Sequence, residues 1–157
     1  MTALTFYTDG SCDNKTGEGG IGVVKIEDKT PIPLISKGTY VQTTSARMEI
    51  LAVVETLIYV YDLKLPERTP IIIYSDNQYV VNTWEKKWID NWIIDSFQGR
   101  KNKDLWKEFI WLLRQTKVRL RMSWVKGHAG DPFNELADEL AHKGRVGFES
   151  IIDDSYR

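Results

Sequence analysis

The sequence has a single cysteine, Cys12, among its 157 residues. One cysteine can neither form an internal disulfide nor supply the several thiolates of a structural zinc site. A disulfide framework and a cysteine-rich metal site are therefore both excluded. Any metal ion that the chain binds should have oxygen ligands.

Long apolar segments are also missing. Apolar runs such as Ile71 to Tyr74 are far shorter than the ~20 residues that a membrane-spanning helix needs. Met1-Thr2-Ala3 leads into an alternating pattern rather than into the apolar core of a signal peptide. We therefore expect a protein that does not enter a membrane and that works in the cytoplasm.

The sequence also lacks an excess of charge of either sign, since the net charge is -1. Proteins that coat nucleic acid through bulk charge are basic, so that class is excluded. Basic residues are concentrated locally, between Trp84 and Lys103 and again from Lys117 to Lys126, while acids gather elsewhere, as at Asp153-Asp154. A nucleic-acid contact would have to use these local regions.

The length and the 42% hydrophobic content suit one compact domain with a sizeable core. The sequence shows no internal repeat, no low-complexity tract and no linker. We therefore predict a single domain over residues 1–157, with a core from about residue 4 to residue 144 and a short C-terminal tail at residues 145–157.

The first part of the chain predicts three strands. Leu4 to Thr8 alternates, Gly19 to Ile26 follows a glycine-rich turn, and Leu34 to Val41 alternates again. Short connections make an antiparallel meander the expected arrangement. From Thr44 the apolar spacing becomes helical and stays so until a stop before Pro66.

The second part of the chain alternates strands with helices. Ile71 to Tyr74 is an unbroken apolar run typical of a buried central strand, and Val118 to Val125 alternates. Asp131-Pro132 is typical of a helix start, with an aspartate cap and proline at the first helical position. The expected helices are Gln78 to Trp88, Asp104 to Gln115 and Asn134 to Lys143.

This order predicts an α/β fold with a five-stranded mixed sheet, antiparallel on one side and parallel in the middle. Ligands of such sheets sit at the carboxyl ends of the parallel strands. Asp9 and Asp76 are expected to close the first strand and the apolar strand there. Taken singly, each has an ordinary explanation, Asp9 as a turn residue before Gly10 and Asp76 as a helix cap.

Two further acids lie on predicted helices. Glu49 comes about one turn into the first helix, and the residue three positions before it is Ala46, which cannot form a capping box. Asp138 lies between Glu135 and Glu139 and could equally be an ordinary acid on a helix surface.

These acids lie in motifs that resemble ribonuclease H of type 1 over nearly the whole chain, from about Leu4 to Gly144. The matching blocks keep the family's order and compatible spacings. They are Thr8-Asp9-Gly10-Ser11, Arg47-Met48-Glu49, Ser75-Asp76-Asn77-Gln78-Tyr79-Val80, Trp124 to Gly130, and Asn134-Glu135 with Asp138-Glu139-Leu140-Ala141.

The resemblance implies the ribonuclease H-like fold and an endonuclease that cuts the RNA strand of RNA–DNA hybrids, leaving 5′-phosphate and 3′-hydroxyl ends. It implies four metal-binding acids, Asp9, Glu49, Asp76 and Asp138. Carboxylates suit two Mg²⁺ ions, with Mn²⁺ as a substitute, because these hard cations prefer oxygen ligands. His128, flanked by Gly127 and Ala129 in a glycine-rich loop, is expected to carry protons near the metals.

The resemblance also indicates how a hybrid would be held. Thr44 and Arg47 match positions that hold a DNA-strand phosphate, Trp88 matches the start of a basic handle that packs against the DNA strand, and Asn77 and Gln78 are candidates for minor-groove contacts. Trp84 is expected to lie in the core. The handle, residues 88–102, is shorter and less basic than in the familiar bacterial members, and Ser45-Ala46 replaces two asparagines that reach the minor groove.

Three alternatives remain at this point. The chain could be a non-catalytic domain of this fold, although all four acids are present. It could be another nuclease of the superfamily, such as a junction resolvase or a 3′–5′ exonuclease, although the Arg47-Met48-Glu49 block and the loop at Lys126 to Gly130 favour type 1. It could be the ribonuclease H domain of a reverse transcriptase, although the handle favours a free, monomeric enzyme.

Overall fold

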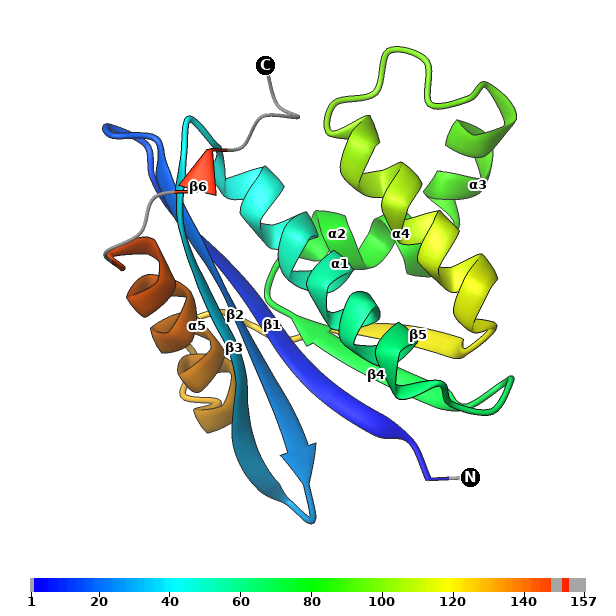
Figure 1. The fold of residues 1–157 in the computed structure, drawn as a ribbon, viewed down its shortest axis with the longest axis horizontal. Coiled ribbons are helices and arrows are strands. Elements are labelled where there is room, and N and C mark those ends of the chain that lie inside the picture. The colour runs from blue at the N-terminus through cyan, green and yellow to red at the C-terminus, as the bar shows by residue number, and fades with distance from the viewer. Residues whose placement is uncertain (1, 148–150, 153–157) are drawn as a thin grey trace.

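The computed structural model describes residues 2–147 and 151–152, in which a mixed sheet is flanked by helices (Figure 1). The strands are β1 (Leu4–Asp13), β2 (Glu18–Glu27), β3 (Thr30–Val41), β4 (Pro70–Ser75), β5 (Arg119–Trp124) and β6 (Ile151–Ile152). The helices are α1 (Ser45–Leu63), α2 (Gln78–Glu85), α3 (Trp88–Ile94), α4 (Lys103–Thr116) and α5 (Pro132–Arg145). Among the described residues, no helix has the length and apolar character to cross a membrane.

The strand order is β5-β4-β1-β2-β3-β6. β1, β2 and β3 form the expected antiparallel meander, and β1 pairs with β4, and β4 with β5, in parallel. The predicted α/β fold and its five strands are confirmed. The two-residue β6, which pairs with the end of β3, was not predicted because two residues are too few to show a pattern.

Most elements differ from the prediction by one or two residues at an end, and β3 begins at Thr30 instead of Leu34. Two other elements differ in ways that matter for the site. β1 does not end at Asp9: it continues to Asp13, because β2 is long enough to pair with it as far as Glu18. The helix expected from Gln78 to Trp88 is two helices. Lys87, between α2 and α3, adopts a φ of 60°, which a continuous α-helix does not allow.

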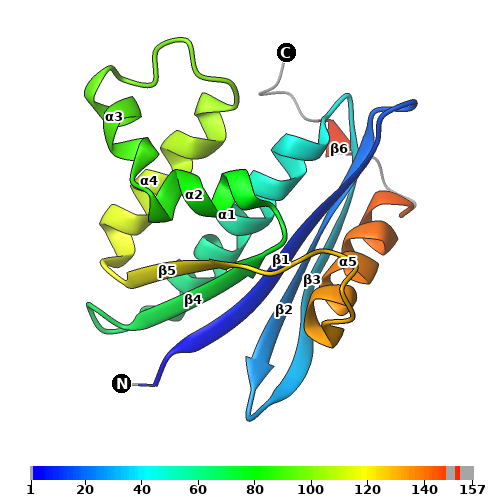
Figure 2. The same cartoon turned by 180° about the vertical axis from the view of Figure 1, so that it is seen from behind.

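The larger core lies between the sheet and α1, with α4 packed beyond α1 (Figure 2). Sheet residues such as Phe6 and Ile73 meet Val53 and Leu57 of α1 with no exposed surface. Trp106 of α4 is buried in the same core. Trp84 packs against it, as predicted, and its indole N–H donates to the Leu120 carbonyl at 3.0 Å.

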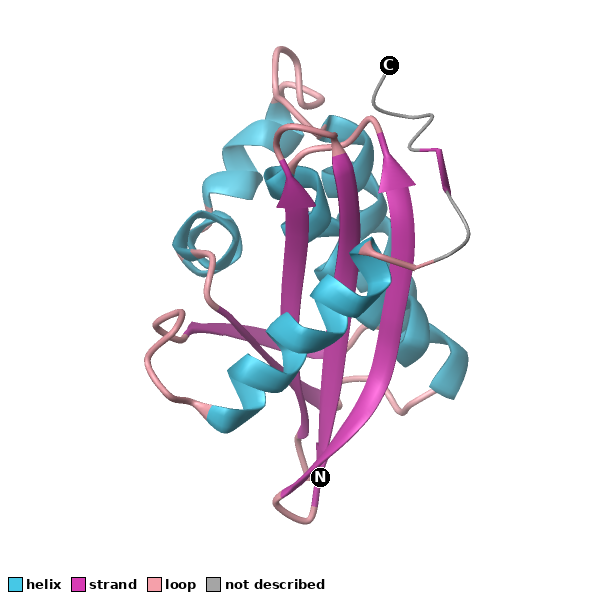
Figure 3. Cartoon of the chain, turned by 90° about the vertical axis from the view of Figure 1, so that its left-hand side faces the viewer, coloured by secondary structure: helices cyan, strands magenta, loops and turns pink. Residues whose placement is uncertain are grey.

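α5 covers the opposite face of the sheet and lies across the long strands (Figure 3). The approach is close because β2 presents glycines to the helix. A Cβ on Gly22 would lie 2.2 Å from the Ala137 carbonyl oxygen, and one on Gly20 would lie 2.2 Å from the Arg145 nitrogen. The Ser36 hydroxyl also donates to the Leu140 carbonyl at 2.7 Å. Glycine on β2 therefore sets the height of α5 above the sheet.

Replacing Gly22 with alanine should destabilise the protein, because the new methyl group would meet helix backbone that cannot rotate away. Overpacking of this kind costs about 1–3 kcal/mol, and 1 kcal/mol lowers the melting temperature of a protein of this size by about 2–4 °C. Thermal unfolding measures the effect. Gly99→Ala is the control, since its Cβ meets nothing within 4 Å and only its φ of 72° is unfavourable. Equal melting temperatures for the two variants would contradict the steric explanation.

Candidate active site

The parallel pairing of β1 with β4 brings two acids together. The last parallel pair joins Thr8 to Ser75, both fully buried, and the next residue on each strand is an aspartate. Asp9 and Asp76 therefore leave neighbouring strands at the same level. Asp9 is 3% exposed although β1 continues beyond it.

Glu49 reaches the same place from α1. Thr44 caps this helix by accepting a hydrogen bond from the Arg47 amide at 3.2 Å, so Glu49 lies in the turn that follows. A Cβ on Gly10 would lie 2.4 Å from the Glu49 nitrogen, so only glycine lets β1 and α1 approach. The Gly10 amide donates to Glu49 Oε1 at 3.1 Å and to Asp9 Oδ1 at 2.9 Å.

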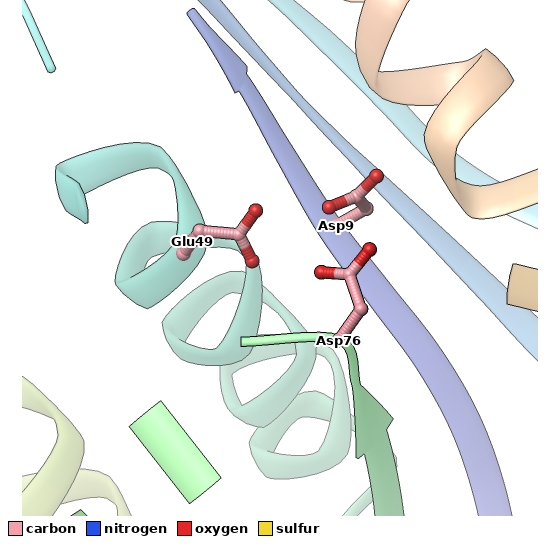
Figure 4. Close-up of side chains that lie close together, drawn as sticks. All are labelled: Asp9, Glu49 and Asp76. Carbon is pink, nitrogen blue, oxygen red and sulfur yellow. The ribbon is translucent and has the colours of Figure 1, made fainter. Parts of the chain in front are cut away.

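The three carboxylates point toward one another (Figure 4). One oxygen each of Asp9, Glu49 and Asp76 lies within 4.8 Å of the other two. Asp138, half-buried on α5, is not part of this closest group, but it lies close enough to raise the pKa values of Asp9 and Glu49. The structure thus gathers all four acids that the sequence singled out.

Burial and mutual repulsion raise the pKa of these carboxyl groups. Desolvation raises the pKa of Asp9 far above its usual range, and the charge of Glu49 raises it further. Desolvation also raises the pKa of Glu49, to about 7, against hydrogen bonds that lower it. The pKa of Asp76 is raised by burial as well. Without a cation, the cluster therefore retains protons near neutral pH.

The donor set fits a divalent cation. Glu49 Oε2 is buried and has no hydrogen-bond partner among the described residues. A buried carboxylate oxygen without a partner is costly in a protein interior, whereas it is a normal ligand of Mg²⁺ or Mn²⁺. Clustered carboxylates and one unsatisfied oxygen are the features expected of a cation site whose ligands are oxygens.

Two residues without a predicted role contact Asp76. The side chain of Asn134, 2% exposed, lies close enough to the carboxylate to lower the pKa of Asp76 against burial. The indole N–H of Trp124 donates to the Asp76 carbonyl at 3.2 Å. Both residues lie in motif blocks that carried the resemblance, which was the available signal. The helix cap proposed as an ordinary role for Asp76 belongs to Asn77, which accepts from the Val80 amide at 3.0 Å.

His128 lies in an exposed loop beside the acids. Its charge lowers the pKa of Asp76, which places it within electrostatic reach of that carboxylate. The loop passes close to the site, since a Cβ on Gly127 would lie 3.1 Å from Asp76 Oδ2. His142, which received no role, hydrogen-bonds to Arg145 near the end of α5.

The comparison with known proteins agrees with this geometry. The family model described as RNase H matches residues 1–146. The chain belongs to the ribonuclease H family. A ribonuclease H of Neisseria meningitidis is 41% identical, covering 94% of this chain and 98% of the relative. Ribonuclease HI of Haemophilus influenzae is 40% identical over 90% of this chain and 88% of the relative.

Solved structures show the same fold. LC9-RNase H1, described as a type 1 enzyme with a type 2 active-site motif, has a TM-score of 0.70 and 25% identity, over 91% of this chain and 72% of its own. The ribonuclease H1 of Halobacterium salinarum has a TM-score of 0.64 and 19% identity, over 91% of this chain and 97% of its own. The relatives support a ribonuclease H of type 1.

Arg47 was expected to contact a DNA-strand phosphate, but in the structure its side chain is buried. It is 2% exposed, and its guanidinium forms a two-pronged ion pair with Asp104 at 2.9 and 2.7 Å. Burial opposes ionisation of Asp104, but Arg47 holds the pKa of that carboxyl below its usual range. Arg47 therefore joins the first turn of α1 to the start of α4. Its predicted phosphate contact remains a prediction and would compete with this pair.

Trp88 begins α3 and faces a second aromatic side chain. Its ring lies 5.8 Å from that of Tyr79, which is 55% exposed and which the sequence left without a role. Arg100 lies over the ring of Trp92 at 4.9 Å. Gln78 is exposed next to Tyr79, whereas Asn77 uses its side-chain oxygen as a helix cap. Tyr79 of α2 and Trp88 at the start of the handle thus form a partly exposed aromatic pair.

Because the pKa of Asp9 is raised, the folded metal-free protein binds more protons than the unfolded chain once the pH exceeds about 4. Its stability should therefore fall as the pH rises from that point toward neutrality. Asp9→Asn removes a carboxyl group whose ionisation the folded state opposes, and should stabilise the metal-free protein at neutral pH by about 1 kcal/mol or more, or about 2–4 °C per kcal/mol.

Thermal unfolding with and without millimolar Mg²⁺ tests this expectation. Mg²⁺ should raise the melting temperature of the original chain and raise that of Asp9→Asn much less, since a ligand is lost. Asp62→Asn, an exposed change on α1, is the control and should alter neither value appreciably. A lower melting temperature for metal-free Asp9→Asn would argue against repulsion in the cluster.

Proposed function

We propose that this ribonuclease H hydrolyses the RNA strand of RNA–DNA hybrids at the cluster formed by Asp9, Glu49, Asp76 and Asp138, and leaves 5′-phosphate and 3′-hydroxyl ends. The observation that carries the proposal is the convergence of three carboxylate oxygens within 4.8 Å, beside a buried oxygen that lacks a partner. The names of the relatives support the same activity.

The acids would hold two Mg²⁺ ions, with Mn²⁺ as a possible replacement. Such a pair of ions activates the attacking water and stabilises the leaving oxygen of a phosphodiester. The chain's own contribution is to fix the ligands. The Gly10 amide orients Asp9 and Glu49, while Asn134 orients Asp76. These contacts keep the ligands in place before a cation arrives.

His128 would move a proton at the edge of this site. Its loop position beside Asp76 leaves the ring open to solvent, so it can exchange protons with water. It would carry a proton to or from the reacting water or the leaving oxygen. This role is distinct from that of a metal ligand, which would have to face the carboxylates directly.

The hybrid would be held at several places around the acids. Trp88 and Tyr79 offer a stacking surface for the DNA strand, and Thr44 would hold a DNA-strand phosphate with Arg47. Gln78, with Asn77, would reach the minor groove, where 2′-hydroxyl groups distinguish RNA from DNA. Ser45 and Ala46 are exposed at the start of α1 but offer fewer polar groups than asparagine would.

The remaining expectations concern organisation. A single domain over residues 1–157 is supported by the one sheet against which the described helices pack. A monomer in the cytoplasm remains a prediction from the sequence.

The activity itself is tested by incubating labelled RNA–DNA hybrid with the protein, with and without Mg²⁺. Single-stranded RNA and duplex DNA are the controls, and cleavage of either control in preference to the hybrid would refute the proposal.

Asp76→Asn should abolish cleavage, because the amide keeps the volume of the side chain but removes the charge that a metal ligand supplies. The expected loss is at least about 10²–10³-fold, as for other removals of transition-state electrostatics. Hybrid binding, measured by fluorescence anisotropy, should stay within about threefold of the original value. The matched control is Asp90→Asn on the exposed surface of α3, which should cleave normally. Near-normal turnover by Asp76→Asn would disprove the metal site.

His128→Ala should slow cleavage by about 10²–10⁴-fold without ending it, since general acid–base assistance has that typical value. The pH profile of turnover should change as well, because a group that exchanges protons with the reacting atoms is gone. His142→Ala is the control for loss of an imidazole, and its profile should match that of the original chain. Complete inactivity, or an unaltered profile, would remove His128 from the mechanism.

A further inference from the structure

β1 continues past the acids along the face that α5 covers. Asp9 pairs directly with Gly22, and Ser11 pairs with Gly20. A Cβ on either glycine would strike the backbone of α5. Because directly paired residues project to the same side of a sheet, Asp9 and Ser11 both face α5.

α5 carries a matching series of side chains. Asp138, His142 and Arg145 are four and then three residues apart, so they share one face of the helix. Asp138 lies beside Asp9 where α5 packs on β1, and two turns later the Arg145 Nε–H donates to the Ser11 hydroxyl at 3.2 Å. The guanidinium of Arg145 therefore lies beyond the acids along the line of contact between β1 and α5, which we call the seam.

The guanidinium of Arg145 is oriented but not neutralised by a close carboxylate. One Nη2–H lies 2.9 Å from His142 Nδ1, and the nearest acid, Asp13, is 4.0 Å away. The other oxygen of Asp13 accepts from the Lys15 amide at 2.9 Å. Arginine has five N–H groups, so the three contacts leave two more for a ligand. The side chain is 18% exposed, which gives an anion access.

The position of this cation suits a nucleic-acid backbone. Two residues along a strand span about 6.6 Å, and successive nucleotides rise about 3.4 Å along a helix axis, so Ser11 is on the order of two nucleotides beyond Asp9. The strand being cut must pass four acids that repel its phosphates. An arginine that is held in position beyond the acids, as Arg145 is, would offset that repulsion.

We propose that Arg145, oriented by Ser11 and His142, binds a phosphate of the RNA strand about two nucleotides from the cleaved bond. The inference rests on the proposed function, since it needs an RNA strand at the acids. Arg145 is a positioning residue: it touches the substrate away from the reacting atoms, and it fixes the register of the strand without reading its sequence.

Lys143 provides a matched control. It is a cation in the same last turn of α5, and its side chain forms an exposed ion pair with Glu139 at 3.1 Å. Its charge interacts with the end of the helix much as that of Arg145 does. If Arg145 serves only the helix, Arg145→Gln and Lys143→Gln should behave alike.

Steady-state cleavage of one hybrid is measured at several salt concentrations with the full chain and both variants. Arg145→Gln should raise KM about tenfold and leave kcat within about twofold, because a charged contact outside the reacting atoms is lost. The slope of log KM against log salt should fall by about 0.7–0.9, the value for one phosphate. Lys143→Gln should change neither KM nor the slope.

The contacted strand is identified with hybrids that carry one neutral methylphosphonate linkage at successive positions of either strand. In the inactive Asp76→Asn background, one linkage in the RNA strand should weaken binding about tenfold. Adding Arg145→Gln should abolish the sensitivity at that linkage alone. Because the linkages are compared within one variant, the result holds even where Arg145→Gln lowers the melting temperature. In the salt experiment, Arg145→Lys should restore the slope of log KM against log salt.

Unchanged KM and salt slope in Arg145→Gln, an equal effect of Lys143→Gln, or a sensitive linkage only in the DNA strand would each overturn the inference. These outcomes are separate from failure of the proposed function. If the original chain cleaves hybrids while Arg145→Gln behaves normally, only the role of Arg145 is lost. If the original chain cleaves no hybrid, the proposed function itself fails.

Discussion

The parallel pairing of β1 with β4 is the constraint on which the site depends. Because the last pair joins Thr8 to Ser75, the next residues, Asp9 and Asp76, must leave the sheet side by side. Every other part of the site is built around this pair. α1 reaches it on one face of the sheet and α5 on the other, and each brings one more acid.

Placing these acids so close together has a cost in stability. Burial raises the pKa values of Asp9 and Glu49, and the charges of neighbouring acids raise them further, which means that the folded protein opposes their ionisation. The glycines do not reduce this cost, but they allow the helices to approach the sheet. Gly10 lets α1 come into contact with β1, and Gly22 lets α5 come into contact with β2. The large apolar core under α1 supplies the stability that the site removes.

Cations near the site serve two different purposes. Arg47 is buried against Asp104, so its charge stabilises the junction of α1 with α4 and is not displayed at the surface. Arg145 remains partly open and points its donors along the seam beyond the acids. In a chain with a net charge of -1, the placement of single arginines decides where a polyanion can bind.

The sequence by itself determined the fold class, the five strands in their chain order, and the two strands and two helices that supply the four acids, because periodicity and the motif blocks are properties of neighbouring residues. It also identified Asp131 as the cap of the last helix, a local hydrogen bond. Only the tertiary structure decided that Arg47 pairs with Asp104, 57 residues away, and that Arg145 meets Ser11, 134 residues away. Such contacts depend on how helices pack across a sheet, and no local pattern encodes that packing.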